Sequence, residues 1–240
     1  MPKALKADLH THSSEDRYEP FIAYSARQLI DRAAQLGYDV LGLTLHRRLW
    51  APAVLIDYAA AKGILLLPGV EARIEGRDVL LYNISPGELA ALRSFEDLAA
   101  LKATKPELLV LAPHPFYPSK HSLLGKLANY HELFDGIEWS SFWCISWLNR
   151  PNRLAAAFAR RHHKALLANS DAHMLGTFGH GYSLISARKS ASDIVAAIRA
   201  GRVRAVSKPL SIARWLAIAC MLLSAPLRRM LARFIKRKRR

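Results

Sequence analysis

Imidazole and carboxylate side chains recur near the ends of short apolar stretches along the chain. His10 and His12 are separated by one residue, so both rings would lie on the same face of a β-strand. Asp171 and His173 repeat this spacing after another apolar stretch. The remaining candidates each follow or lie within an apolar stretch of their own: His46, Glu71, His114 and Glu138. This repeated placement predicts that the side chains converge at one end of a sheet.

Such a set of side chains suits a centre that holds several metal ions. Imidazole and carboxylate groups without thiolate favour zinc, manganese or iron. The set is larger than one ion needs, so we expect two or three divalent ions, with Glu71 or Asp171 as a bridge. A centre of this kind provides a metal-bound hydroxide near neutral pH and holds the oxygens of an in-line displacement. Hydrolysis of a phosphate ester fits this chemistry.

Each of these residues also has an ordinary interpretation when it is taken alone. A single histidine after a strand is more often a loop residue than a ligand, and Asp171 could be a helix N-cap. Glu71 could be solvated, and Glu138 could pair with an arginine. The recurrence of such residues at the same end of successive strands favours a shared site.

Other side chains could bind the substrate or transfer a proton to it. Arg47 and Arg48 directly follow His46, and together with Arg153 they are candidates for bidentate contacts to a substrate phosphate. The alternative for all three is an exposed arginine without a partner. His173 or His46 could protonate the leaving oxygen if it is not committed to a metal.

Aromatic residues cluster after Glu138, namely Trp139, Phe142, Trp143 and Trp147. They could stack on a nucleobase, or they could form the core of an irregular lid. The sequence does not choose among a phosphomonoester, a nucleotide and an oligonucleotide as the substrate.

The elements that would position these residues alternate between strands and helices. Continuous apolar strands separated by helices predict an α/β fold with a parallel sheet, open or closed into a barrel. The strand over residues 79–84 is expected to pair back on its predecessor after a turn at residues 75–78. Strands are predicted over residues 7–11, 40–45, 64–67, 79–84, 108–112, 136–139, 165–168 and 182–185, and helices over 24–36, 52–61, 88–102, 152–163 and 191–200.

Composition favours one domain with an appendage. The chain has 240 residues, 51% of them hydrophobic, which is enough for one buried core. We assign residues 1–205 to the metal-binding domain and residues 206–240 to a tail. Cys144 and Cys220 provide neither a disulfide framework nor a paired-cysteine zinc motif. No apolar run of signal-peptide length occurs at the N-terminus, so we expect a cytoplasmic protein.

The tail carries most of the positive charge. Residues 201–240 hold 12 Lys and Arg and no acidic residue; removing these 12 from the net charge of +16 leaves +4 for residues 1–200. An apolar stretch, residues 212–223, is too short to span a bilayer, and an amphipathic basic helix is predicted after Pro226. Residues 210–240 could bind an anionic membrane at its inner face. Nucleic acid binding by the tail is a weaker alternative. The simplest interpretation is that the tail forms a helix that packs on the barrel.

Five motifs make the chain resemble the PHP (polymerase and histidinol phosphatase) domain family, and they occur in the order found in that family. They cover roughly residues 5–186. The motifs are Asp8-Leu9-His10-Thr11-His12-Ser13, Leu43-Thr44-Leu45-His46, Pro68-Gly69-Val70-Glu71, Ala112-Pro113-His114-Pro115 and Asn169-Ser170-Asp171-Ala172-His173. The resemblance implies a distorted seven-stranded (β/α) barrel of PHP type, here with a C-terminal basic amphipathic helical tail.

The resemblance also implies a division of the ligands among the metals. His10, His12, Glu71 and Asp171 would hold one metal. Glu71 and His114 would hold a second, with Glu138 as a further ligand. His46 and His173 would hold a third, together with Glu15 or Asp16.

The chain departs from the family pattern at two places. Leu45 stands where the family usually has an Asp before the histidine, and the first motif continues as Ser14-Glu15-Asp16-Arg17-Tyr18. The lost Asp is a plausible orienter of ligands, so its absence could weaken or retune the site.

The resulting prediction is a phosphoesterase, either a phosphatase or a nuclease, that uses two or three divalent ions (Mn, Zn or Fe). One alternative is a catalytically degraded PHP module that acts as a binding or scaffold protein. A further alternative is a metal-dependent hydrolase of C–N or C–O bonds on a similar barrel.

Overall fold

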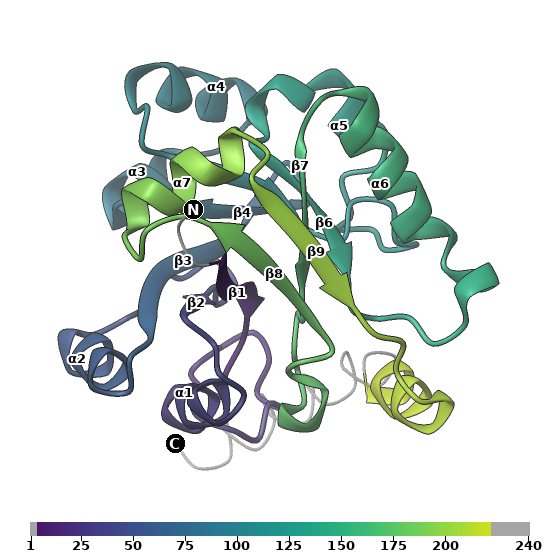
Figure 1. Ribbon diagram of the computed structural model, residues 1–240. Coiled ribbons are helices and arrows are strands. Elements are labelled where there is room, and N and C mark those ends of the chain that lie inside the picture. The colour runs from purple at the N-terminus through teal and green to yellow at the C-terminus, as the bar shows by residue number, and fades with distance from the viewer. Residues whose placement is uncertain (1–3, 222–240) are drawn as a thin grey trace, which may run out of the picture.

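One mixed β-sheet curves into a nearly closed barrel (Figure 1) in the computed structural model, which describes residues 4–221. Within these residues the sheet has nine strands in the order β7-β6-β5-β4-β3-β2-β1-β8-β9, rather than the seven implied by the resemblance. The strands are β1 (Ala4–Thr11), β2 (Val40–Leu43), β3 (Leu65–Ile74), β4 (Arg77–Tyr82), β5 (Leu109–Ala112), β6 (Gly136–Ser140), β7 (Ala165–Asn169), β8 (Gly181–Ser186) and β9 (Val203–Ser207).

The strands that carry or precede the candidate ligands all run in one direction. β1, β2 and β3 pair in parallel, and so do β5, β6 and β7. β4 lies between the two sets and pairs back on β3, as predicted for residues 79–84; it is also antiparallel to β5. Its turn needs only Glu75 and Gly76, both at positive φ (46° and 79°), a conformation typical of two-residue hairpins.

The expectation of a parallel sheet is wrong for β8, which is antiparallel to β1 and to β9. β9 was not predicted. It is short and only partly buried, and its sequence Val-Arg-Ala-Val-Ser lacks strict apolar–polar alternation, so it did not stand out in the sequence. This strand runs two residues past the expected domain boundary at residue 205.

Several helices begin at a serine whose side chain accepts from a backbone N–H of the first turn. Ser25 and Gln28 form such a capping box at the start of α1. The structure divides the expected helix over residues 88–102, because Ser94 caps a new helix there. The helices are α1 (Ala26–Gln35), α2 (Ala53–Ala61), α3 (Pro86–Ala91), α4 (Phe95–Thr104), α5 (Gly125–Asn129), α6 (Arg150–Arg161) and α7 (Ala191–Arg199), with short 3-10 turns η1 (His131–Leu133), η2 (Ser146–Leu148) and η3 (Leu175–Thr177).

Hydrogen bonds from side chains join β7 to the strands across the remaining gap in the barrel. The Ser183 hydroxyl of β8 donates to the Ala168 carbonyl and accepts from the Ala168 N–H, both at 3.0 Å. The Leu9 N–H donates to the Asn169 side-chain oxygen at 2.9 Å. Because these bonds bring β7 against β1 and β8, the first and last ligand-bearing strands become neighbours.

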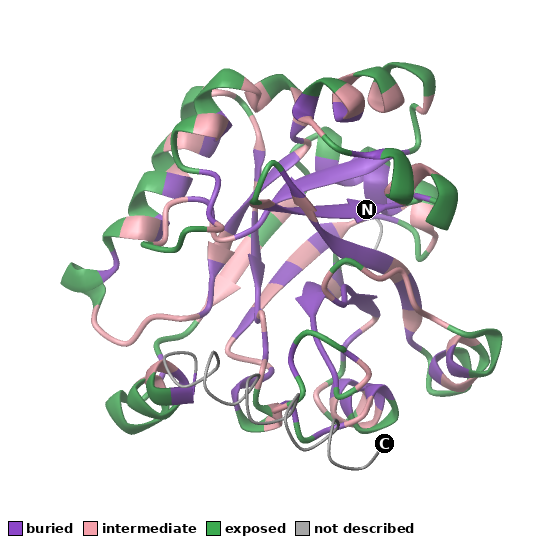
Figure 2. Cartoon of the chain, turned by 180° about the vertical axis from the view of Figure 1, so that it is seen from behind, coloured by how far each residue is buried: buried purple, intermediate pink, exposed green. Residues whose placement is uncertain are grey.

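The barrel interior is packed around Tyr82, whose hydroxyl donates to the Leu9 carbonyl. Gly42 on β2 and Gly69 on β3 make room for its ring, since a Cβ at either position would collide with it. The strands are largely buried, while the helices expose their outward faces (Figure 2). The packed interior leaves the functional groups only at the rim of the barrel.

The chain continues after β9 into a helix formed by residues 212–221. Leu210, Ile218 and Met221 are buried there against Phe21 and Phe142. None of the helices in residues 4–221 is both long and apolar enough to cross a membrane. The amphipathic basic helix expected after Pro226 lies outside the described residues.

Candidate metal centre

The predicted ligands converge at the ends of the strands that run in the same direction. His10 lies on β1, and His12 directly follows that strand. His46 follows β2 and forms an isolated bridge to Glu71. Glu71 was expected to follow a strand that ends at residue 67. It lies within β3 instead, because this strand continues to Ile74.

The remaining candidate ligands come from the second half of the barrel. His114 follows β5, and Asp171 and His173 follow β7. His114 and Asp171 adopt positive φ values of 27° and 46°, which are unusual for residues other than glycine. Such backbone conformations cluster at functional sites, where surrounding contacts hold them in place.

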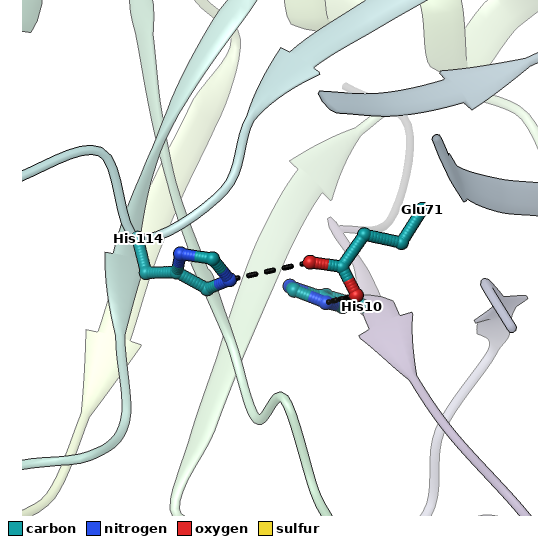
Figure 3. A group of neighbouring side chains, drawn as sticks. All are labelled: His10, Glu71 and His114. Carbon is teal, nitrogen blue, oxygen red and sulfur yellow. Dashed lines mark ion pairs between the residues drawn. The ribbon is translucent and has the colours of Figure 1, made fainter. Parts of the chain in front are cut away.

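The Glu71 carboxylate is the centre of the cluster. Its Oε2 lies 3.4 Å from His10 Nε2, 3.3 Å from His12 Nε2 and 3.1 Å from His46 Nε2. Its Oε1 lies 3.3 Å from His114 Nε2. Figure 3 shows His10 and His114 reaching this carboxylate from different elements. One carboxylate is thus placed between four imidazoles, as a bridging ligand would be.

Asp171 is a second carboxylate shared by histidines. Its Oδ1 lies 3.3 Å from His10 Nε2 and 3.2 Å from His12 Nε2. Three triads of potential ligand atoms result, each within 4.8 Å of one another: His10, Glu71 and His114; His10, His12 and Asp171; and His12, His46 and Glu71. The triads share members, so ions held by them would lie close together.

The donor set fits metal ions by two further observations. Two ligand atoms that each lie about 2.0–2.1 Å from one tetrahedral zinc ion are roughly 3.3 Å apart, close to the separations around Glu71. His10 Nε2 and His12 Nε2 are also buried and have no hydrogen-bond partner. Buried polar atoms without a partner are costly, and a metal ion would satisfy them.

Glu138, expected to be a further metal ligand, belongs to none of the three triads and instead contacts other candidate ligands. Its Oε2 lies 2.8 Å from His10 Nδ1 and accepts from the Asn169 amide at 3.0 Å. Its Oε1 accepts from the His114 N–H at 3.1 Å. Both carboxylate oxygens are therefore engaged, and the bond to Nδ1 directs His10 Nε2 toward Glu71 and Asp171.

Asp16 has a similar relationship to two other histidines. Its Oδ2 lies 2.7 Å from His46 Nδ1 and 3.4 Å from His12 Nδ1. The histidine hydrogen bonds hold the pKa of Asp16 well below its usual value, although burial alone would raise it. Glu15, the alternative to Asp16, instead accepts from the Ala26 N–H at the start of α1.

His173 belongs to none of the three triads and pairs with Glu19. Its Nδ1 lies 2.8 Å from the Asp171 carbonyl. Burial alone would lower the pKa of His173, but the carboxylates of Glu19 and Asp171 raise it to about 10. Glu19 was missed in the sequence, where its only signal is an acidic residue three positions after Asp16.

Without metal, the cluster balances its own charges. Burial alone would lower the pKa of His46 and of His114, but the surrounding carboxylates, chiefly Glu71, raise each to about 9. The imidazoles in turn hold the pKa of Glu71 and of Asp171 well below their usual values, against the effect of burial. Divalent cations could replace these protons as the counter-charge.

A cavity of about 610 Å³ opens beside the cluster, within the range of small-molecule sites. Of the three predicted phosphate ligands, only Arg47 lines it. Arg48 donates to the Glu15 carbonyl, and Arg153 donates to the carbonyls of residues 146 and 147. Arg73, which the sequence did not single out, also lines the cavity and donates to Asp78 at 2.6 Å.

The aromatic cluster is divided between the cavity and the remainder of the fold. Phe142 lines the cavity and stacks on Trp215, with ring centroids 5.4 Å apart. Trp139 and Trp143 pack edge to face, and Trp147 is 72% exposed. The predicted aromatic region therefore contributes one residue to the cavity wall.

Comparisons with known proteins agree with this architecture. Residues 149–203 match the family model described as PHP-associated. No curated protein matches the chain by sequence. The fold is similar to that of PsfC from Pseudomonas syringae, with a TM-score of 0.61 and 18% identity over 96% of this chain and 99% of that chain.

Two further solved structures share the fold. A protein from Bifidobacterium adolescentis, assigned as a metal-dependent phosphoesterase, has a TM-score of 0.53 and 14% identity over 72% of this chain and 89% of that chain. An amidohydrolase from Chromobacterium violaceum, with bound sulfate and no metal, has a TM-score of 0.52 and 18% identity over 88% of this chain and 96% of that chain. The family match covers residues 149–203, and the likeness to the three solved structures shows a shared fold.

Proposed function

We propose that the protein hydrolyses phosphate esters at a centre of two or three divalent metal ions. The observation that carries the proposal is the Glu71 carboxylate, whose two oxygens are shared among the Nε2 atoms of four histidines. A carboxylate placed in this way suits ions that lie a few ångströms apart, the arrangement used for in-line displacement at phosphorus.

Eight side chains divide the work of building this centre. Metal ions, when bound, would supply a hydroxide nucleophile near neutral pH and neutralise charge on the phosphoryl oxygens. Asp16 and Glu138 hold three of the histidines in orientation. The residues that would hold the ions are His10, His12, His46, Glu71, His114 and Asp171.

The substrate phosphate would be bound by side chains on the cavity wall. Arg47 and Arg73 line the cavity beside the metal ligands, and Lys120 adds a further positive charge. Guanidinium groups bind phosphate oxygens through paired hydrogen bonds. Their position supports a phosphate ester over a neutral amide as the substrate.

His173 is the residue that we propose to protonate the leaving oxygen. It lines the cavity, and Glu19 and Asp171 raise its pKa enough to keep it protonated at neutral pH. His46, the other predicted acid, points its Nε2 at Glu71, so it is better placed to be a ligand. A protonated imidazole beside the cavity can act as a general acid.

Hydrolysis of a C–N bond is a second candidate, favoured by the fold shared with the amidohydrolase from Chromobacterium violaceum. That structure holds sulfate, which resembles phosphate in shape and charge. The positive charge on the cavity wall makes the phosphoesterase the stronger proposal. The remaining alternative, a catalytically degraded module that acts as a scaffold, requires that the protein has lost metal binding.

Release of phosphate from a panel of phosphomonoesters, nucleotides and short oligonucleotides tests the proposal. The full chain would be assayed with Mn²⁺, with EDTA, and as the variants Asp171→Ala and Asp57→Ala. Asp57 is exposed on α2, away from the cluster, so it is the matched control. We expect turnover that EDTA and Asp171→Ala abolish and Asp57→Ala preserves.

No turnover by metal-loaded protein across the panel would overturn the phosphoesterase. Turnover of amides under the same conditions would support the second candidate. Failure to retain any metal would support the scaffold alternative.

A further inference from the structure

The end of the described chain forms part of the candidate active site. The helix of residues 212–221 follows β9 and lies at the lower edge of the view in Figure 1, as does α1. Trp215, Ile218 and Ala219 from this helix line the same cavity as His46, Asp171 and the other metal ligands. Residues that are three and four apart share one helix face, so the helix presents one face to the cavity.

This face is held in position by several contacts. The Leu210 N–H donates to the Trp143 carbonyl at 2.8 Å, which fixes the start of the segment. Ile218 and Met221 are buried against the barrel, while Trp215 stacks on Phe142 at an angle of 16°. Ile212 and Leu216 of the same helix are 59% and 50% exposed. Trp215 is thus a fixed part of the cavity wall.

The cavity lining contains two chemically different groups of side chains. One group comprises the candidate metal-binding carboxylates and imidazoles, together with Arg47, Arg73 and Lys120. The other group is apolar: Phe142, Leu210, Trp215 and Ile218 pack in one cluster, and Ala219 lies on the same helix as the last two. A molecule that is complementary to both has a charged phosphate at one end and an apolar group at the other.

We infer that the substrate is a phosphate monoester of an apolar alcohol, whose hydrocarbon or aromatic part packs on Trp215 and Phe142. The inference rests on the proposed phosphoesterase function and specifies its substrate class. A cavity of about 610 Å³ suits one small molecule, whereas an oligonucleotide would extend well beyond it. A polyol phosphate such as glycerol phosphate would leave the apolar wall without a partner.

The test compares alkyl phosphates, because a phenolate leaves more readily for reasons unrelated to the cavity. We would measure kcat/KM for 3-phenylpropyl phosphate, glycerol phosphate and AMP, with Mn²⁺ present. An apolar group in a fitting pocket changes kcat/KM by roughly 10–200-fold. We expect 3-phenylpropyl phosphate to be preferred over the other two by at least about tenfold.

Variants of the wall separate a substrate contact from a general effect on the fold. Trp215→Ala should reduce the preference about tenfold, and Trp215→Phe should retain most of it. Trp147→Ala is the matched control, because this tryptophan is 72% exposed and is not part of the cavity wall. It should leave the preference unchanged.

A binding measurement keeps this inference separate from the proposed reaction. The dissociation constants of 3-phenylpropylphosphonate and methylphosphonate, which are not hydrolysed, would be measured by calorimetry for wild type, Trp215→Ala and Trp147→Ala. Tighter binding of the phenylpropyl compound, lost only in Trp215→Ala, would support the apolar wall even if no ester were hydrolysed. Equal affinity for both compounds, an unchanged preference in Trp215→Ala, or a preference for AMP would overturn it.

Discussion

Asp16 hydrogen-bonds to both the ring and the backbone of His46: its Oδ2 lies 2.7 Å from Nδ1 and accepts from the N–H at 2.9 Å. This contact bears on the departure noted at Leu45, where the family usually has an Asp. Leu45 is fully buried in the hydrophobic core, so it is not an orienter. Asp16, 30 residues earlier, supplies the carboxylate that holds His46.

Asp16→Asn should weaken metal binding without unfolding the protein. The amide retains the size of the carboxylate but loses the negative charge that lies 2.7 Å from Nδ1 of His46 and 3.4 Å from Nδ1 of His12. Loss of such a partner typically reduces metal affinity about 10–100-fold. Metal competition with a chelator would measure the change, and Asp57→Asn is the control. Unchanged metal affinity in Asp16→Asn would show that Asp16 does not replace the orienting carboxylate that the family usually has at position 45.

Glu138→Ala should destabilise the protein even without metal. Glu138 accepts from the Asn169 amide and the His114 N–H and contacts His10 Nδ1, and all of these groups are buried or half-buried. Each buried donor left without a partner costs about 1–3 kcal/mol. Urea unfolding in EDTA would measure the loss, and Glu107→Ala, at an exposed position before β5, is the control. Equal stability of both variants would mean that Glu138 acts only when metal is bound.

Metal binding at neutral pH should release protons. In the metal-free protein the neighbouring carboxylates, against the effect of burial, raise the pKa of His46 and His114 to about 9. A metal ion binds the neutral ring, so a bound proton must leave first. The apparent metal affinity should therefore increase as the pH increases up to about 9. Below that pH it should decrease by roughly tenfold per pH unit for each displaced proton. Calorimetry at pH 7 in buffers of different ionisation enthalpy would count the protons. A count of zero would contradict the prediction.

Arg73 and Arg153 should differ in their effect on substrate binding. Arg73 lines the cavity, whereas Arg153 donates to backbone carbonyls of residues 146 and 147. A hydrogen bond to a charged group contributes about 1.5–3 kcal/mol, so Arg73→Ala should raise KM or the phosphonate dissociation constant by roughly tenfold or more. Arg153→Ala should leave both unchanged. A larger effect of Arg153→Ala than of Arg73→Ala would support the sequence-based prediction that Arg153 binds the substrate phosphate.

The basic tail should bind anionic vesicles. Residues 201–240 carry 12 positive charges and no acidic residue, and Ile212 and Leu216 are exposed on the preceding helix. Such segments bind anionic lipid through charge and apolar contacts, and salt weakens this binding. Cosedimentation of the full chain with phosphatidylserine vesicles, but not with phosphatidylcholine vesicles, is expected. Binding to DNA in preference to either vesicle would support the nucleic acid alternative.

The sequence predicted which side chains converge because most of the candidates lie at or shortly after a recognisable apolar strand. His10, His12, His46 and Glu71 come together as that spacing predicted. Residues that orient ligands could not be distinguished from ligands, because both are acidic. Asp16 and Glu138 differ from Asp171 only in which atoms they face.

The parts of the fold that were missed depend on contacts between distant segments. The antiparallel pairing of β8 with β1 is determined across more than 170 residues, and local periodicity carries no information about it. The contribution of Trp215 to the cavity wall depends on the Leu210 contact with Trp143 and is likewise not local. Local patterns therefore predicted most of the elements, and long-range packing decided which surfaces met.

The joining of β7 to β1 and β8 has a consequence for biosynthesis. Asp171, which completes the triad of His10 and His12, is separated from them by most of the barrel sequence. A chain emerging from the ribosome therefore exposes two paired imidazoles long before their carboxylate partner is translated. The complete candidate centre forms only after β7 has docked, so metal ions bound there would load after closure of the barrel rather than guide the first steps of folding.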